Sequence, residues 1–208
     1  MSFLSSAWAT GGHEMSEAAR GAWQLLTRLG EAQILLPAML AALLWLLLAA
    51  RSWRLALAWL AGTALAALLT TLTKVAFIGY EIGYAPWDYT GISGHAMFAA
   101  AVLPVLAGLM AGKATPRWRR LAIVAGYGLA ALIAYSRLPV RAHSPIEALA
   151  GLALGSLASA VALTVCRVPA TQPHRWLGVG LLLGMLSLSL GAPPSATHNW
   201  VQRLALAV

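Results

Sequence analysis

The sequence predicts an all-α, polytopic membrane protein with six transmembrane helices and an N-terminal interfacial helix. Of its 208 residues, 60% are hydrophobic and only 10% are charged, and the mean hydropathy is +0.75. Soluble domains carry about 25% charged residues. Apolar runs such as "ILLPAMLAALLWLLLAA" come close to the roughly 20 residues that a helix needs to cross a membrane. No segment alternates apolar and polar residues as the strands of a membrane β-barrel do.

The chain begins with a segment that we expect at the membrane surface. "MSEAARGAWQLLTRLG", residues 15–30, alternates apolar and polar residues at helical spacing, which is typical of an interfacial helix, here anchored by Trp23. Residues 1–20 lack a basic start followed by an apolar core, so we do not expect a cleaved signal peptide. The predicted organisation is an interfacial segment 1–30, a membrane domain 31–191 and a C-terminal tail 192–208.

Six apolar segments within the membrane domain are long enough to be spans. We place them at about 31–50, 53–73, 94–112, 118–136, 146–166 and 175–191. Three glycine pairs have the spacing that lets helices approach closely, and we interpret them as packing positions: Gly108/Gly112, Gly151/Gly155 and Gly180/Gly184.

The basic residues predict the orientation in the membrane. With six spans, both termini lie on one side, and eight basic residues fall on the other: Arg51, Arg54, Lys113, Arg117, Arg119, Arg120, Arg167 and Arg175. Arg20, Arg28 and Arg203 fall on the terminal side, apart from three basic residues that we assign to a possible site. Basic loops stay in the cytoplasm, so both termini should face outward.

Composition also excludes several classes of functional site. The lone Cys166 excludes an internal disulfide and a cysteine-based metal site. Asp88 is the one aspartate in the chain, which argues against enzymes that hold two metals with clustered carboxylates. The net charge of +8 reflects membrane orientation, so we expect no nucleic-acid partner. We expect no metal and no cofactor.

Three polar clusters meet on the predicted outward side. They are Lys74 at the end of the second span, "GISGHAM" (residues 91–97) at the start of the third, and "SRLPVRAHSPIEALAG" (residues 136–151) before the fifth. Charged groups at membrane depth are costly, which favours a shared site. Each cluster also has a structural interpretation. Lys74 could extend to the interface, Ser93 could cap a helix, and "SPIE" forms a good capping box.

The structural interpretations leave His95 and His143 unexplained, and their chemistry fits phosphate. Backbone N–H groups at a helix N-terminus bind anions, and lysine and arginine add positive charge. Of two histidines, one can attack phosphorus while the other protonates the leaving oxygen. A carboxylate bonded to the attacking imidazole fixes its tautomer.

These motifs resemble the type 2 phosphatidic acid phosphatase superfamily, whose pattern is K-x6-R-P, P-S-G-H and S-R-x5-H-x3-D. The third motif reads "SRLPVRAHSPIE", with glutamate in place of aspartate. The second reads "ISGH", with Ile92 where proline is usual. The first departs most, because Glu81 and Ile82 stand where the family has arginine and proline. The resemblance covers residues 70–155.

The resemblance implies a role for each site residue. His143 would be the nucleophile that forms a phosphohistidine, Glu147 would orient it, and His95 would be the general acid. The phosphoryl oxygens would be held by Lys74, Ser93, Gly94 and Arg137. Arg141 lies in the same loop, and it could replace the missing arginine or pair with Glu81 instead.

The expected function is metal-independent hydrolysis of a lipid-linked phosphate or diphosphate at the outer face of a bacterial plasma membrane. Undecaprenyl diphosphate, phosphatidylglycerophosphate, phosphatidate and lipid A are all compatible with the sequence. Two alternatives stay open. One is a lipid-phosphate transporter or flippase with the same basic pocket. The other is a catalytically weakened relative that only binds phosphate, because Glu81 removes one phosphate ligand. Oligomeric state is not predicted.

Overall fold

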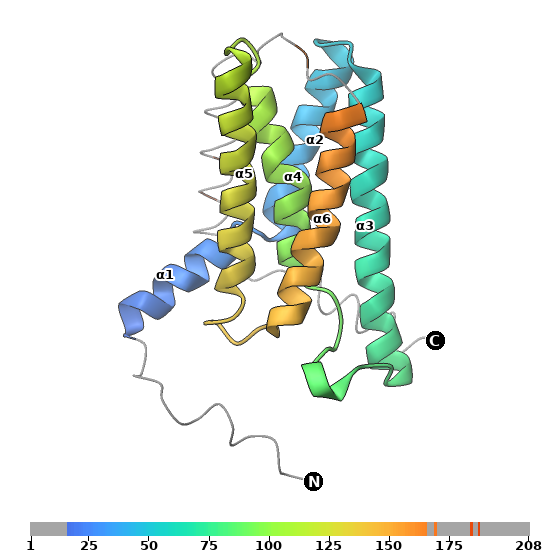
Figure 1. Ribbon diagram of the computed structural model, residues 1–208, viewed down its shortest axis with the longest axis vertical. Helices are drawn as coiled ribbons and strands as arrows, with labels where there is room; N and C mark the ends of the chain where they lie inside the picture. Colours follow the sequence, from blue (N-terminus) through green and yellow to red (C-terminus); the bar gives the residue numbers. More distant parts are fainter. Residues whose placement is uncertain (1–15, 166–168, 170–183, 185–186, 188–208) are drawn as a thin grey trace.

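The described part of the chain is a bundle of helices. The computed structural model describes residues 16–165 together with 169, 184 and 187. Figure 1 shows helices running up and down beside one another, with α1 leaving the bundle at its lower end. The elements are α1 (Glu17–Arg28), α2 (Ala32–Leu48), α3 (Trp53–Tyr80), the short 3-10 helix η1 (Ala85–Trp87), α4 (Gly94–Met110), α5 (Pro116–Ser136) and α6 (Pro145–Val165).

The all-helical prediction is confirmed for this part of the chain, where no strand forms and Tyr84–Tyr89 is an isolated β-bridge. Helices α2 to α6 lie at the positions of the first five predicted spans. Three stretches are long and apolar enough to cross a membrane: Glu17–Leu48, which comprises α1 and α2, Trp53–Tyr80 and Pro145–Val165. Gly94–Met110 is apolar but shorter. The sixth predicted span, 175–191, and the C-terminal tail lie outside the described residues, apart from 184 and 187.

Helix α1 forms where the amphipathic pattern predicts it. The Ser16 side chain accepts a hydrogen bond from the Ala19 N–H and caps the helix, and Glu17 and Arg28 lie at the ends that suit their charges. The Trp23 ring packs edge-on against Tyr135 of α5, with 5.6 Å between ring centroids. This contact ties α1 to the lower end of the bundle.

Helix α3 is longer than the predicted span 53–73. It continues to Tyr80, so Lys74 lies within the helix and not at its end. No proline or glycine interrupts residues 74–78, and the helix stops where Glu81 adopts the left-handed conformation (φ 55°). At 1.5 Å per residue its 28 residues span about 42 Å, more than the roughly 30 Å of a hydrocarbon core.

Helix α4 is the centre of the bundle, in contact with α2, α3, α5 and α6. Nearly every side chain from Ala96 to Leu109 is buried. Pro104 has no N–H to give to the carbonyl of Ala100. That carbonyl instead accepts a hydrogen bond from Ser159 Oγ of α6 (2.8 Å). The carbonyl that the proline leaves free is therefore satisfied, and its hydrogen bond to Ser159 links α4 to α6.

Two predicted glycine positions set how closely α6 approaches α4. A Cβ atom at Gly155 would overlap the Met97 carbonyl oxygen, and one at Gly151 would overlap the Ser93 carbonyl oxygen. The packing interpretation of the pair Gly151/Gly155 is therefore confirmed. The close approach brings the start of α6 against the start of α4, where the site residues lie.

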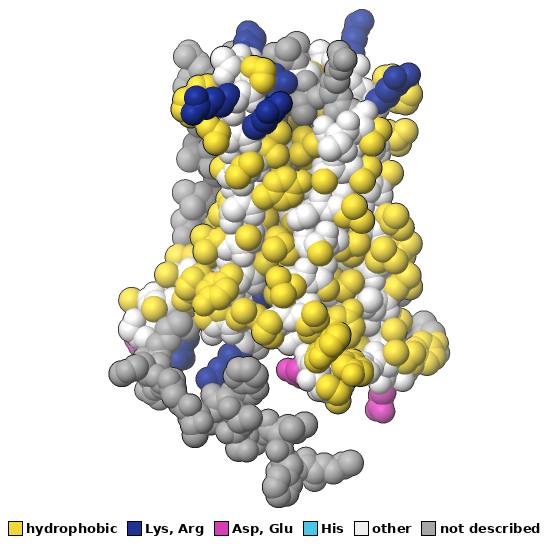
Figure 2. Space-filling view, in the orientation of Figure 1, with side chains coloured by type: hydrophobic (Ala, Val, Ile, Leu, Met, Phe, Trp, Pro, Cys, Tyr) yellow, Lys and Arg dark blue, Asp and Glu magenta, His cyan; other side chains and the backbone are white. Residues whose placement is uncertain are grey.

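Basic side chains gather at the end of the bundle away from α1. Figure 2 shows dark blue Lys and Arg groups around this end and a belt of apolar side chains below it. The α2–α3 and α4–α5 connections and the first turns that follow them carry Arg51, Arg54, Lys113, Arg117, Arg119 and Arg120. Arg167 and Arg175 lie outside the described residues.

We predict that Gly155→Ala lowers the free energy of unfolding by about 1–3 kcal/mol, because the new methyl group has no room against the Met97 carbonyl. Thermal unfolding in detergent measures the change. Gly128→Ala is the matched control, since a Cβ there meets nothing within 4 Å. It should raise stability by about 0.5–1 kcal/mol. Equal effects of both substitutions would contradict the packing assigned to Gly155.

Candidate active site

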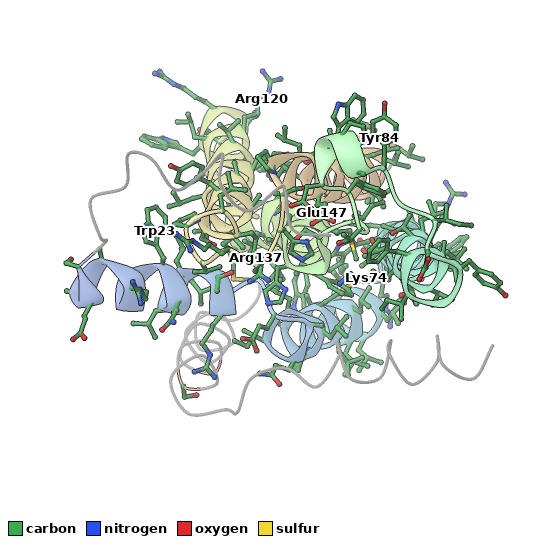
Figure 3. All side chains as sticks on the ribbon, turned by 90° about the horizontal axis from the view of Figure 1, so that it is seen from below. Trp23, Lys74, Tyr84, Arg120, Arg137 and Glu147 are labelled. Carbon is green, nitrogen blue, oxygen red and sulfur yellow. The ribbon has the colours of Figure 1, made fainter. Side chains whose placement is uncertain are left out.

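The predicted site residues come from four helices and converge at one end of the bundle. Figure 3 looks onto that end, where Lys74, Arg137 and Glu147 lie toward the middle of the bundle while Trp23 and Tyr84 lie toward its edge. Lys74 belongs to α3, Arg137 is the residue after α5, and Glu147 lies in the first turn of α6. Ser93 and His95 belong to the start of α4.

His143 and Glu147 form a direct pair. The imidazole Nδ1 lies 2.7 Å from Glu147 Oε2, and both side chains are largely buried. A carboxylate only accepts hydrogen bonds, so Nδ1 carries the proton and Nε2 of the neutral ring has a free lone pair. The spacing of four residues brings the two side chains together at the start of α6. This geometry suits a nucleophilic imidazole supported by a carboxylate.

The same carboxylate also forms the predicted capping box. The Ser144 N–H donates to Glu147 Oε2 (3.1 Å), and the Glu147 N–H donates to Ser144 Oγ (3.4 Å). The structural interpretation of "SPIE" is therefore correct. It does not compete with the pairing to His143, because one carboxylate oxygen accepts from both the imidazole and the Ser144 N–H.

The second oxygen of Glu147 binds the loop before α4. Oε1 accepts hydrogen bonds from Thr90 N–H (2.5 Å), Thr90 Oγ1 (2.6 Å) and Gly91 N–H (3.0 Å). The Glu147 carbonyl also accepts from the Ser93 N–H (3.1 Å). One residue of α6 thus fixes both the histidine in front of it and the start of α4.

His95 lies within electrostatic reach of Arg137, His143 and Lys74. Lys74 in turn is within reach of Arg137 and Glu147. Gly30, at the corner between α1 and α2, packs against the backbone of His95, and a Cβ there would lie 3.1 Å from the His95 carbonyl oxygen. The bundle therefore gathers two histidines, two cations and a carboxylate in one place.

The Arg137 side chain is hydrogen-bonded to the end of α1, near the corner between α1 and α2. Its Nη1 donates to Thr27 Oγ1 (2.6 Å). Burial lowers the pKa of Arg137 to about 10. The negative charge of Glu31 acts in the opposite direction and raises the pKa. The guanidinium therefore stays protonated at neutral pH. Glu31 is buried and lies 3.7 Å from Arg28, so this corner carries its own compensating charges.

Two buried donors at the site are open to a ligand. Ser93 Oγ and Arg137 Nε have no hydrogen-bond partner among the described residues. An unsatisfied buried polar group costs about 1–3 kcal/mol, so each favours a ligand or water. Gly94 adds no side chain, and a Cβ there would meet only Thr70, at 4.0 Å. With Lys74, which lies within electrostatic reach of Arg137, these groups are of the types that bind an oxyanion.

Arg141 and Glu81 lie on the exposed side of this end. Both adopt the left-handed conformation, at φ 54° and 55°, and both side chains are exposed. Among the described residues, the ion pairs are Arg28–Glu31 and His143–Glu147, so no ion pair joins Arg141 to Glu81. The suggested ion pair between the loop of Arg141 and the loop of Glu81 is therefore not present.

Several contacts around the site were not predicted from sequence. They involve Thr90 and Gly91 at Glu147, Thr27 and Glu31 at Arg137, and Thr73, whose Oγ1 accepts from the Ile92 N–H (3.2 Å). No motif marks these residues, since each meets its partner only through packing. Within the described residues, no group of three or more His, Cys, Asp or Glu side chains could hold a metal ion.

Fold and site together define a helical membrane protein with a histidine–carboxylate pair near two buried cations. A family model described as the PAP2 superfamily matches residues 75–168. The chain is also 34% identical over 190 residues to an uncharacterized 22.5 kDa protein in the cps region of Klebsiella pneumoniae, covering 89% of this chain and 91% of that protein. No solved structure gives a significant match. The chain belongs to the PAP2 superfamily, and this membership suggests phosphatase activity on phosphate esters.

We predict that Arg141 and Glu81 do not stabilise each other. Thermal unfolding of Arg141→Glu, Glu81→Arg and the double variant should give a coupling free energy below about 0.5 kcal/mol, as for independent sites. Arg28→Glu with Glu31→Arg provides the positive control, since that pair lies at 3.7 Å. A coupling above about 1 kcal/mol between positions 81 and 141 would show that the two loops are tied together.

Proposed function

We propose that this protein hydrolyses a lipid-linked phosphate or diphosphate without a metal ion, through a phosphohistidine at His143. The observation that carries the proposal is the 2.7 Å contact between His143 Nδ1 and Glu147 Oε2. In the neutral ring this contact leaves the Nε2 lone pair free, and His95 lies within electrostatic reach of His143, Lys74 and Arg137. Membership in the PAP2 superfamily supports the same class of reaction.

The proposed reaction has two steps. His143 Nε2 attacks phosphorus, the bond from phosphorus to the leaving oxygen breaks, and His95 donates a proton to that oxygen. Glu147 stabilises the imidazolium that forms. A water molecule then attacks the phosphohistidine, His95 takes a proton from this water, and phosphate leaves while His143 becomes neutral again. The phosphoryl oxygens are held by Lys74, Ser93, the Gly94 N–H, Arg137 and Arg141.

The position of the site supports a lipid substrate. Lys74 is inside α3, a helix apolar and long enough to cross a membrane, so a phosphate bound there sits near the membrane surface. A lipid headgroup can reach this level from the side, with its tails left between helices. Basic side chains gather at the other end of the bundle (Figure 2), and basic loops stay in the cytoplasm. We therefore place the site and both termini at the outer face of a bacterial plasma membrane, with six spans in all.

Glu81 supports a second candidate, a weakened relative that binds phosphate without turning it over. It stands where the family has an arginine. Its backbone caps α3, and its side chain is exposed. We propose that Arg141 supplies the missing cation. Its backbone lies in the loop between Arg137 and His143.

We predict that His143→Ala lowers kcat by more than about a thousandfold while the protein still folds and inserts into the membrane. Phosphate release by purified protein in detergent, with EDTA present, from a panel of lipid phosphates and diphosphates measures this. His143→Ala activity above about a tenth of wild type would rule out this nucleophile. Wild-type protein that binds these lipids without releasing phosphate would favour a transporter or a weakened relative.

For Arg141 we predict that replacement by lysine lowers kcat/KM by about a hundredfold, because lysine keeps the charge but loses the fork that grips two phosphate oxygens. The same assay measures it. Arg120→Lys, at the opposite end of the bundle, is the matched control and should keep wild-type activity. Full activity in Arg141→Ala would remove Arg141 from the phosphate site.

We predict opposite labelling for cysteines at the two ends of the bundle. In a Cys166→Ser background, Ala85→Cys should react with an impermeant thiol reagent added to intact cells, and Thr115→Cys should react only after the cells are opened. Both positions are exposed in the structure, so access depends on sidedness. The reverse pattern would place the site in the cytoplasm.

A further inference from the structure

The Glu147 carboxylate accepts more hydrogen bonds than its pairing with His143 requires. Its Oε2 meets His143 and the Ser144 N–H, while its Oε1 accepts from Thr90 N–H, Thr90 Oγ1 and Gly91 N–H. Only 2% of the residue is exposed, so its hydrogen-bond donors come mainly from the protein. The orientation of the carboxylate is therefore set from both of its oxygens.

The extra reach of glutamate explains why a second anchor matters. A glutamate side chain has one more rotatable bond than an aspartate, so pairing with His143 alone leaves more orientations of the carboxylate open. Hydrogen bonds to a charged group contribute about 1.5–3 kcal/mol each. Among the described residues, the Thr90 hydroxyl, at 2.6 Å from Oε1, is the one side-chain donor to this oxygen.

We propose that Thr90 is a positioning residue, which fixes the Glu147 carboxylate so that its other oxygen stays aligned with His143 Nδ1. Its part in turnover rests on the proposed phosphohistidine reaction, whereas its part in the alignment of His143 does not. Thr90 lies in the exposed loop between α3 and α4, far along the chain from both partners. It belongs to none of the three sequence motifs.

The chain offers a matched control for this role. Thr73 Oγ1 accepts a hydrogen bond from the Ile92 N–H (3.2 Å), so it anchors the same loop without touching Glu147. Thr90→Val and Thr73→Val each replace a hydroxyl with a methyl group of similar shape. Only the first removes a donor from the carboxylate. Thr90→Ser keeps that donor.

The kinetic test compares kcat and KM of these variants on a lipid phosphate that the wild type hydrolyses. Thr90→Val should lower kcat about tenfold, the value of one hydrogen bond to a charged group, with KM within about twofold. Thr90→Ser and Thr73→Val should stay within about threefold of wild type. Unchanged kcat in Thr90→Val, an equal loss in Thr73→Val, or failure of serine to restore kcat would overturn the proposal.

A second measurement does not need turnover. Proton NMR of protein labelled with ¹⁵N-histidine in detergent should show a strongly downfield Nδ1–H signal from His143, identified by its loss in His143→Ala. Thr90→Val should shift this signal, while Thr73→Val and Thr90→Ser should leave it in place. A signal unaffected by Thr90→Val would overturn the proposal. The predicted shift in a protein that hydrolyses no lipid phosphate would support the positioning role while rejecting the proposed function.

Discussion

The carboxylate of Glu147 is the interaction on which the site depends. One oxygen meets His143 and the N-terminus of α6, and the other meets the loop that leads into α4. A buried carboxylate is tolerated in a bundle this apolar because each of its oxygens accepts several hydrogen bonds. Removing it would leave the histidine without a fixed tautomer and the start of α4 without its anchor. Structure and chemistry therefore rely on the same side chain.

The central helix α4 turns that local arrangement into a stable site. Gly151 and Gly155 let α6 approach α4 closely, and Gly126 of α5 packs against Pro104. Because Ser159 accommodates the proline, α4 can stay buried on all sides. The start of α4, with Ser93 and His95, is consequently held rigidly against the start of α6. The proposed binding of a tetrahedral phosphoryl group requires such preorganised donors.

The placement of charge follows from the cost of burying it. Lys74 and Arg137 lie near one end of the bundle, where a side chain can share a bound anion or reach the membrane surface. The remaining described basic residues of the connections gather at the other end (Figure 2), and apolar side chains fill the belt between. Arg137 is further stabilised by Thr27 and Glu31. The α1–α2 corner is thus part of the site and not only a surface anchor.

The sequence by itself determined the features that depend on neighbouring residues. Apolar runs predicted a helical membrane protein, and the Ser144–Glu147 capping box marked the start of α6. The i,i+4 spacing also brought His143 to Glu147. Only the tertiary structure decided the extension of α3 past Gly79 to Tyr80. It also decided the contacts of Thr90 with Glu147, 57 residues apart, and of Thr27 with Arg137, 110 residues apart. Such partners are chosen by how the helices pack, and helix packing leaves no periodic trace in a single sequence.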